Sequence, residues 1–338
     1  MNRYDRQERV TSVGKQGQEK IQQASIVIVG CGAIGSYTAE QLVRSGIHTL
    51  YLIDPDIVEL SNLQRQSLFT EDDANNHELK VVAAKKHLNQ INSNVNIKIF
   101  PSELSSSILA KIEYFDLLID CCDNFFTRDL INRLAINNNF NYIFSSCAGT
   151  YGEVMFIDPR KGPCLNCLFP NINKLKNNDC DLIGVSTPIV PIISSLQVSL
   201  IFNYLINDEI NNQQLINVDC HKLQFNTFNI HKVKNCPVCS QNHVSLPKKT
   251  INNKIHRMCG SKTFSINFDN KIQLEKLANI LNKKNINYQW NNFFINFNLD
   301  DINISYFKNA KLNIYNAKDL NQAQNIYHKF KKILEIQS

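Results

Sequence analysis

Three glycines near the start of the chain have a spacing that could serve nucleotide binding. Gly30, Gly32 and Gly35 form G-x-G-x-x-G directly after residues 26–29, a β-branched run that predicts a buried strand. Glycines there allow a tight turn, a close approach of the backbone to a phosphate, and close packing of helix on strand. The following helix N-terminus offers free N–H groups to an anion. The pattern predicts a site for a dinucleotide or ATP, with a purely structural turn as the alternative.

Charged and polar side chains follow the predicted strands at the same edge as the glycine turn. Asp54 ends the strand predicted at residues 50–53, at about the ~20-residue offset expected of an acid that binds ribose. Further candidates lie in loops after strands or at the start of a helix: Asn62, Arg65, Gln66, Lys80 and Asp123. Each alone could be a helix cap or a solvated charge. Together, their cations can neutralise a triphosphate and an Asp can hold Mg²⁺, which favours ATP.

Other classes of nucleotide protein fit these residues less well. The sequence has no G-x-x-x-x-G-K-[ST] motif, so it is not a P-loop ATPase. An NAD-dependent oxidoreductase would need neither this much positive charge nor a second acid, and no proton donor is evident. A protein that binds a nucleotide without chemistry is the more remote alternative.

Two C-x-x-C pairs predict a metal site. Cys164/Cys167 and Cys236/Cys239 together offer four thiolates, which suits a tetrahedral structural zinc. Such a closed site would clamp the hairpin at residues 215–240 to the loop after residue 157. Unligated turn cysteines are the alternative.

Cys180 lies in a polar segment, residues 170–188, with little periodicity. A thiol in an exposed loop is a candidate nucleophile, but a bystander cysteine fits equally well. Cys259 is left undecided, and the scattered histidines are assigned no chemistry. The remaining cysteines lie in or beside apolar strands or the glycine turn, which favours core packing: Cys31, Cys121, Cys122, Cys147 and Cys220.

The elements that must position these residues alternate between strand and helix. This alternation predicts a doubly wound, Rossmann-like, mostly parallel sheet with a zinc-clamped antiparallel extension. Residues 3–20 are polar and are expected to form an arm or short helices outside the core. The predicted strands are 26–29, 50–53, 95–100, 115–119, 142–146, 152–157, 215–218 and 223–230, and the main helices after the glycine turn are 78–91, 126–138 and 189–205.

A polar linker at residues 241–254 separates a second unit. We therefore expect domains at residues 1–245 and 255–338, the second a small α+β domain of unknown role. Its predicted strands are 263–268, 288–298, 302–307 and 311–315, and its predicted helices are 273–283 and 320–333.

The composition of the 338-residue chain limits the classes of protein to which it can belong. Hydrophobic residues make up 43%, enough for a sizeable core. The excess of 36 Lys+Arg over 30 Asp+Glu is spread out, so a nucleic-acid partner is not expected. No signal sequence or apolar run of about 18 residues is evident, which predicts a cytoplasmic protein without a membrane partner. In that compartment the 11 cysteines are not expected to form disulfides.

Taken in order, the motifs resemble a known family. They are Arg3-Tyr-Asp-Arg6-Gln, the glycine turn, Asp54-Pro-Asp56, Asn62-Leu-Gln64-Arg65-Gln66, Lys80, Asp120-Cys-Cys-Asp123-Asn124 and the two cysteine pairs. Over residues 3–240 the chain resembles the ThiF/MoeB/HesA proteins, bacterial relatives of ubiquitin-activating enzymes. The C-terminal unit resembles the appendage of some Gram-positive-type ThiF members and is too short for a rhodanese domain.

The resemblance implies adenylyl transfer to the C-terminal Gly-Gly carboxylate of a ubiquitin-like sulfur carrier. By similarity, Asp54 holds the ribose and Asp123 binds Mg²⁺. Asn62, Arg65 and Lys80 contact phosphates; Gly30, Gly32, Gly35, Asp56, Gln66 and Asn124 complete the ATP site. Arg6 matches an arginine supplied across a homodimer interface.

The resemblance also bears on Cys180, on the type of carrier and on Gln64. Cys180 matches a cysteine that can take the activated carrier end as a sulfur-linked acyl group. The carrier is expected to be ThiS type, for thiamine thiazole synthesis, or alternatively MoaD type, for molybdopterin, with a sulfur donor such as a cysteine desulfurase. Relatives usually read Asn-Leu-Asn-Arg-Gln, so Gln64 puts in doubt a contact at that position.

Overall fold

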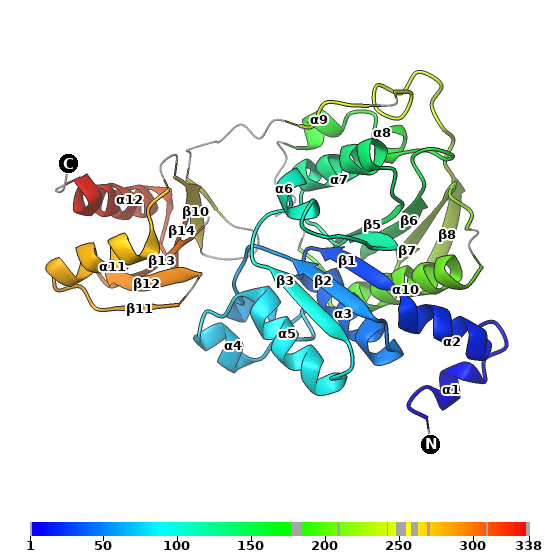
Figure 1. Cartoon of the computed structure of the whole chain (residues 1–338). Helices are drawn as coiled ribbons and strands as arrows, with labels where there is room; N and C mark the ends of the chain where they lie inside the picture. Colours follow the sequence, from blue (N-terminus) through cyan, green and yellow to red (C-terminus); the bar gives the residue numbers. More distant parts are fainter. Residues whose placement is uncertain are drawn as a thin grey trace. The chain divides into compact units, whose positions relative to one another are not determined.

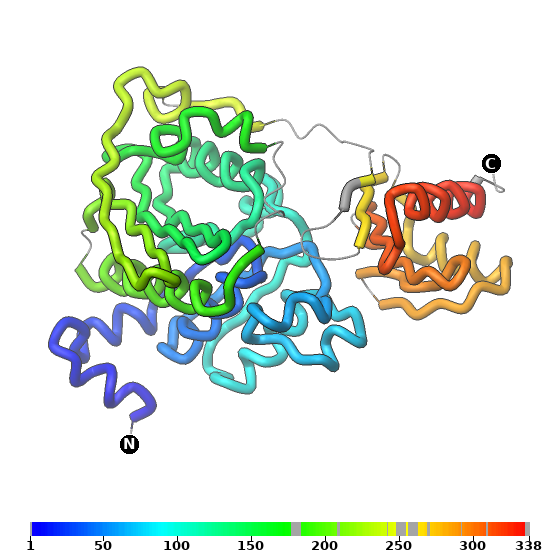
Figure 2. Tube along the Cα trace, turned by 180° about the vertical axis from the view of Figure 1, so that it is seen from behind, coloured from blue at the N-terminus to red at the C-terminus, as the bar shows by residue number. Residues whose placement is uncertain are grey.

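The computed structural model divides into two compact units, Met1–Pro247 and Lys248–Ser338, which Figures 1 and 2 show from opposite sides. It describes residues 2–176, 184–207, 210–241, 243–247, 255–257, 263–268, 271–291, 293–308 and 310–335. The segment around Cys180, and Cys259, lie outside the described residues.

An eight-stranded sheet forms the centre of the first unit, in the order β3-β2-β1-β4-β5-β6-β7-β8. The parallel strands are β1 (Ser25–Val29), β2 (Thr49–Ile53), β3 (Asn96–Phe100), β4 (Leu117–Asp120) and β5 (Tyr142–Ala148). The antiparallel extension consists of β6 (Tyr151–Ile157), β7 (Gln214–Asp219) and β8 (Gln224–Asn229). The predicted doubly wound sheet with an antiparallel extension is confirmed. Its strand order reverses between β1 and β4, which is where such sheets bind ligands.

Helices cover both faces of this sheet and give the unit three layers (Figure 1). Alternate residues of each strand point to opposite faces, so Ile26 and Ile28 join one core and Val27 and Val29 the other. The first core is covered by α2 (Gly14–Gln23), α3 (Ala33–Ser45), α5 (Lys80–Ile91) and α10 (Ile189–Asn207). The second is covered by α6 (Ser106–Leu109), α7 (Phe125–Asn138), α8 (Leu165–Leu168) and α9 (Ile172–Leu175). Short turns of helix complete the unit at α1 (Asp5–Glu8), η1 (Leu60–Asn62) and α4 (Glu71–Asn75).

Within the described residues, α10 is the one helix long and apolar enough to cross a membrane. It packs on α3, β5 and β6, and its residues Ile189, Ile193 and Ile201 are fully buried in the first core. These contacts are those of a core helix in the three-layer unit.

The N-terminal segment is more integrated than expected. Helix α1 has no buried residue, but α2 buries Gly17, Gln18 and Ile21. The Gln18 amide donates to the carbonyl of Ser45 at 3.0 Å. The prediction that residues 3–20 lie outside the core is therefore wrong for α2, because residues at helical spacing turn one side of this polar helix inward.

A six-stranded antiparallel sheet forms the second unit, in the order β11-β12-β13-β14-β10-β9. Helices α11 (Leu274–Lys283) and α12 (Leu320–Glu335) share one hydrophobic core with the strands. The strands are β9 (His256–Arg257), β10 (Phe264–Asn267), β11 (Tyr288–Trp290), β12 (Phe294–Leu299), β13 (Ile302–Phe307) and β14 (Lys311–Ile314).

One predicted strand of this unit is wrong. Residues 288–298 form two strands, β11 and β12, which pair antiparallel instead of running on. The side-chain oxygen of Asn291 accepts from the backbone N–H groups of Phe293 and Phe294, which closes a turn between them. An asparagine can make such local bonds in place of the strand ladder.

Candidate functional site

The glycine turn brings the ends of β1 and β4 together. Gly30 has φ +93°, and a Cβ there would lie 2.5 Å from the carbonyl oxygen of Cys121. A Cβ on Gly35 would lie 2.0 Å from the carbonyl oxygen of Gly30. Neither position has room for a side chain, and Gly30 also has a backbone conformation that other residues rarely adopt. These two glycines therefore set how closely α3 and β4 approach the turn.

Gly32 differs because a side chain there would not be crowded. A Cβ on Gly32 would meet nothing nearer than the Gln66 amide nitrogen, at 3.8 Å. Gly32 is also the N-cap of α3 and provides no side-chain cap, so the first N–H groups of the helix are left for another acceptor. Gln66 is 4% exposed, and its Oε1 has no hydrogen-bond partner among the described residues. A ligand with both anionic and donor groups fits this cradle.

Asp54 fixes the backbone on two sides of the site through its carboxylate. Its Oδ2 accepts from the backbone N–H of Cys31 at 2.7 Å, and its Oδ1 accepts from the N–H of Asp56 at 2.8 Å. Burial raises the pKa of Asp54, an effect that the charge of Lys80 opposes. Each oxygen keeps a second lone pair, so the carboxylate can still accept from a hydroxyl of a ribose.

Lys80 is the cation at the centre of a group of acids. It begins α5, is 9% exposed, and has its Nζ 3.5 Å from Oδ2 of Asp56. Burial alone would lower the pKa of Lys80, but the charges of Asp54 and Asp56, with smaller contributions from Asp123 and Glu59, raise it above the ordinary lysine value. Lys80 therefore stays charged at neutral pH, as a phosphate-binding lysine must.

The loop after β2 carries the next candidates. Asn62 is 6% exposed and accepts from the N–H of Glu59, which forms a capping box around η1. Arg65 is half-buried, and its Nη1 donates to the carbonyl of Ser61 at 3.0 Å. Asn62 therefore holds the loop in shape, while the guanidinium of Arg65 keeps donors available for a ligand.

Gln64, the departure from the family pattern, has a contact that the sequence did not predict. The Thr187 hydroxyl donates to the Gln64 carbonyl at 3.1 Å and to its Oε1 at 2.7 Å. Nearby, Ser186 donates from its N–H to the carbonyl of Gly149. The loop after β2 is thus tied to the chain that enters α10.

Asp123 and Asn124 stand at the entrance to α7, and both are exposed. The Asn124 side chain accepts from the N–H of Thr127 at 2.8 Å as the N-cap of α7, and donates to Oδ1 of Asp123 at 3.2 Å. An exposed carboxylate near Lys80 is a suitable hard oxygen ligand for Mg²⁺. Asn124 orients that carboxylate and caps the helix.

The two cysteine pairs converge on one cluster. The four sulfurs of Cys164, Cys167, Cys236 and Cys239 lie within 4.8 Å of one another, and all four residues are buried. Sγ of Cys164 is 3.7 Å from that of Cys236, and Sγ of Cys167 is 3.5 Å from that of Cys239. A tetrahedral zinc with bonds of about 2.3 Å would have sulfurs about 3.8 Å apart. The cluster is therefore compatible with structural zinc.

The close sulfurs also perturb one another. The hydrogen bond between them raises the pKa of the Cys164 thiol and lowers that of Cys167. Four thiolates packed this closely would repel one another if all were ionised. A divalent metal would relieve this repulsion and allow all four to ionise.

One predicted site residue, Arg6, is not brought into this site of its own chain. Arg6 lies on α1, where it is exposed. Cys180 falls outside the described residues. Sequence reasoning in turn missed Glu59, which adds to the negative charge around Lys80. Its signal was its position in the same polar loop as Asn62 and Arg65.

The chain is similar in sequence and in fold to known proteins. Residues 4–238 match the ThiF family. The sulfur carrier protein ThiS adenylyltransferase of Bacillus subtilis is 31% identical over 333 residues, 97% of this chain and 98% of that protein. The protein of the same name from Escherichia coli is 31% identical over 239 residues, 70% of this chain and 94% of its own length. The crystal structure of E. coli MccB with ATP superposes with a TM-score of 0.61, at 23% identity, over 70% of this chain and 73% of that one.

Substituting alanine at Gly35 or Gly32 tests the glycine turn. Gly35→Ala should lower the thermal unfolding midpoint strongly, because its Cβ would collide with backbone that cannot move aside. Gly32→Ala is the matched control and should change the midpoint little, because its nearest neighbour is at van der Waals distance. Thermal denaturation followed by circular dichroism measures both. Equal midpoints for the two variants would contradict this account of the turn.

Proposed function

The chain belongs to the ThiF family, and on that premise we propose that it is an ATP-dependent adenylyltransferase for a ubiquitin-like sulfur carrier protein of the ThiS type. The observation that carries the proposal is the end-to-end match with a ThiS adenylyltransferase, which extends through both units. The product would serve sulfur transfer in thiamine thiazole synthesis, and we further propose a cytoplasmic location. Activation of a MoaD-type carrier for molybdopterin synthesis is the alternative.

The proposed reaction joins the carrier's C-terminal Gly-Gly carboxylate to AMP. A carboxylate oxygen forms a bond to the α-phosphorus of ATP, and the bond from that phosphorus to the oxygen bridging the β-phosphate breaks. The products are an acyl-adenylate and pyrophosphate. Such chemistry depends mainly on positioning and on neutralising charge.

Each residue of the site has a proposed part in this reaction. Lys80 and Arg65 neutralise phosphate charge, with Asn62 as a further phosphate contact, and Asp54 accepts from the ribose. The Asp123 carboxylate would hold Mg²⁺, which when bound adds positive charge beside the phosphates. The N–H groups at the start of α3 provide a further anion-binding edge.

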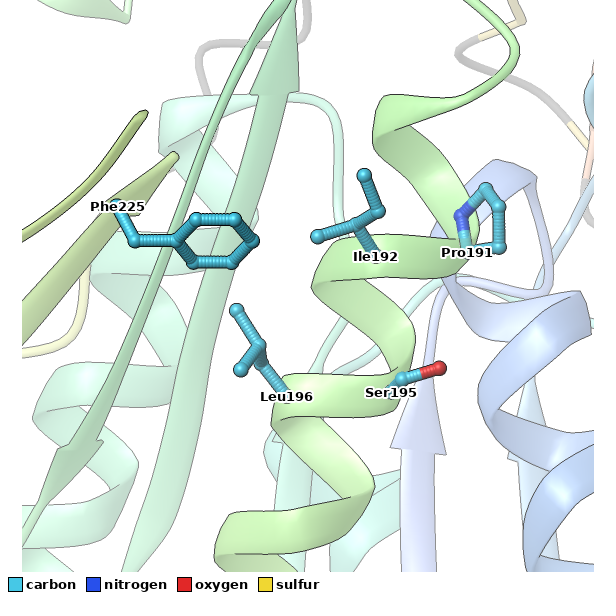
Figure 3. Close-up of a pocket in the computed structure, with 5 residues that line it drawn as sticks. All are labelled: Pro191, Ile192, Ser195, Leu196 and Phe225. Atoms are coloured by element: carbon cyan, nitrogen blue, oxygen red, sulfur yellow. The ribbon is translucent and has the colours of Figure 1, made fainter. Parts of the chain in front are cut away.

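We also propose that the enzyme is a homodimer in which Arg6 reaches the partner's ATP. An apolar hollow of about 420 Å³ lies between α10 and β8. In Figure 3 the Phe225 ring faces Ile192 and Leu196 across it, although Phe225 is 62% exposed. Exposed apolar surface of this kind supports contact with another protein chain.

Two parts of the proposal rest on the family alone. Cys180 would take the activated carrier end as a sulfur-linked acyl group before sulfur arrives from a donor such as a cysteine desulfurase. The second unit would bind the carrier or that donor. The ThiF family match covers residues 4–238, which lie within the first unit, so we assign adenylation itself to that unit.

Pyrophosphate exchange into ATP tests the reaction. With a Gly-Gly-ended carrier, the wild-type protein should exchange labelled pyrophosphate, and Lys80→Met or Asp123→Asn should lower the rate by about 100-fold or more. Lys86→Met is the control, because Lys86 is on the same helix but its side chain is 56% exposed.

ThiS-type and MoaD-type carriers should be compared side by side in this assay. Faster exchange with a MoaD-type carrier would favour the alternative pathway. Absence of exchange with both carriers, while ATP still binds, would refute the enzyme and leave a nucleotide-binding protein.

We propose that the cysteine cluster holds one structural zinc per chain. Metal analysis of the purified protein should find zinc, and Cys239→Ser should lose it together with several degrees of thermal midpoint, since metal binding contributes folding energy. Cys220→Ser is the matched control, because Cys220 lies outside the cluster. Wild-type zinc content in Cys239→Ser would contradict the proposal.

A further inference from the structure

We propose that Arg128 is a positioning residue that fixes the direction of the Asp123 carboxylate and thereby sets the affinity of the site for ATP with Mg²⁺. The inference rests on the proposed function, which assigns Asp123 to the metal. It concerns a buried residue of α7.

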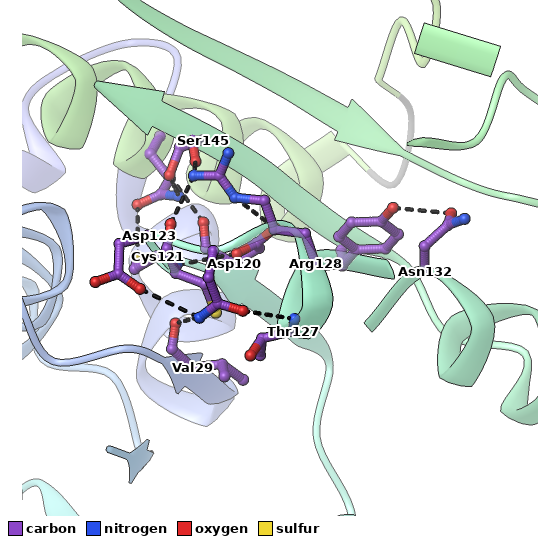
Figure 4. A network of polar contacts seen from close by, with 12 residues as sticks. Val29, Asp120, Cys121, Asp123, Thr127, Arg128, Asn132 and Ser145 are labelled. Carbon is purple, nitrogen blue, oxygen red and sulfur yellow. Dashed lines mark hydrogen bonds and ion pairs between the residues drawn. The ribbon is translucent and has the colours of Figure 1, made fainter. Parts of the chain in front are cut away.

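Arg128 holds the peptide immediately before Asp123 (Figure 4). It is 5% exposed, and its Nη2 donates to the carbonyl of Cys122 at 2.6 Å and to the carbonyl of Ser145 at 3.0 Å. The Cys122 carbonyl belongs to the peptide unit that carries the N–H of Asp123. Because a peptide unit is planar, a bond that fixes this carbonyl also fixes the backbone from which Asp123 projects.

Two aromatic rings keep the guanidinium in place. Its central carbon lies 5.2 Å from the ring centre of Phe125 and 5.1 Å from that of Phe144. Arginine stacks on aromatic faces through its planar, delocalised charge, and a lysine cannot reproduce this contact together with two fixed hydrogen bonds. The side chain of Arg128 is therefore held in one orientation by packing as well as by hydrogen bonds.

Asp120 binds the second backbone group of Cys122, its N–H. It is fully buried, its Oδ1 accepts from the N–H of Cys122 at 3.0 Å, and its Oδ2 lies 3.9 Å from Nε of Arg128. Burial raises the pKa of Asp120, and the charge of Arg128 opposes that rise. The N–H and the carbonyl of Cys122 are thus bound by this one buried pair.

Ser145 links the end of β4 to two helices that cover the first core. The Ser145 hydroxyl donates to the carbonyl of Asp120 at 2.8 Å and accepts from the Gln197 amide at 2.9 Å. The Gln197 oxygen in turn accepts from the hydroxyl of Thr38 at 2.7 Å. Strands β4 and β5 and helices α3 and α10 therefore support a loop whose last residue, Asp123, is exposed.

ATP binding with and without added MgCl₂, without any carrier, tests this inference. The wild-type protein should bind ATP more tightly with Mg²⁺. Arg128→Lys and Arg128→Met should lose about 10-fold of the affinity with Mg²⁺ and keep the affinity without it, because the glycine turn and Lys80 are untouched. Arg128→Lys keeps a charge beside Asp120, so it provides a folded variant if Arg128→Met is unstable. Calorimetry gives the affinities, and circular dichroism and zinc content verify each preparation.

Arg133→Met is the matched control. Arg133 lies on the next turn of α7 and has its own buried ion pair, with Nε 3.0 Å from both carboxylate oxygens of Asp129. Its loss should lower stability without changing the effect of Mg²⁺ on ATP affinity. A general loosening of α7 would instead move both arginine variants together, and that result would overturn the inference.

A double-mutant cycle separates positioning from a purely structural role. If Arg128 acts through Asp123, Arg128→Lys should weaken ATP binding with Mg²⁺ in the wild type and have no further effect on Asp123→Asn. Additive losses, or wild-type Mg²⁺ dependence in folded Arg128 variants, would overturn the inference. If the ATP affinity of the wild-type protein does not change with Mg²⁺, that result would refute the assignment of Asp123 to the metal. Failure of carrier exchange alone would refute only the proposed reaction.

Discussion

The backbone of Gly30 lies against the carbonyl of Cys121, so close that a Cβ would fall 2.5 Å from the oxygen. This approach joins β1 to β4 at the point where the strand order reverses. The loop from β1 becomes the glycine turn, and the loop from β4 continues to Asp123. Backbone N–H groups and an acidic side chain are therefore presented at one edge of the sheet, because a residue without a side chain lets two strand ends approach.

The balance of charge around Lys80 determines the electrostatics of this site. Lys80 is nearly buried, and such a lysine would lose its proton if burial acted alone. The carboxylates of Asp54 and Asp56 keep it charged, while Lys80 in turn moderates the rise in the pKa of Asp54. A polyanion that enters beside Lys80 replaces part of the interaction that the acids provide. Lys80 is thus held in its charged form by the fold itself, which is the kind of electrostatic preorganisation that phosphate chemistry uses.

Helix α7 links the loop that carries Asp123 to the cysteine cluster. Its first turn is capped by Asn124 beside Asp123. Farther along, Oδ1 of Asn132 accepts from the N–H of Leu165, between the first two cysteines, and Asn137 exchanges two hydrogen bonds with the backbone of Val244. One rigid element therefore contacts the loop after β4 and both segments that supply sulfur atoms. This arrangement explains why a cysteine cluster far along the sequence belongs to the same unit as the glycine turn and Asp123.

The sequence alone determined the doubly wound sheet, because strand and helix periodicity indicates it. It also determined the grouping of Asp54, Lys80 and Asp123, because the ends of parallel strands and the starts of helices meet at one edge of such a sheet. The sequence also indicated that the two cysteine pairs form one site, since C-x-x-C spacing is typical of metal ligands and can be read directly from the sequence. The roles of these residues toward a ligand remain predictions. Tertiary structure decided the buried face of α2, the turn that separates β11 from β12, and the contacts of Arg128 and Gln64. Those features depend on which groups meet across loops and layers, and a charge inside a helix pattern does not reveal whether water or a carbonyl will surround it.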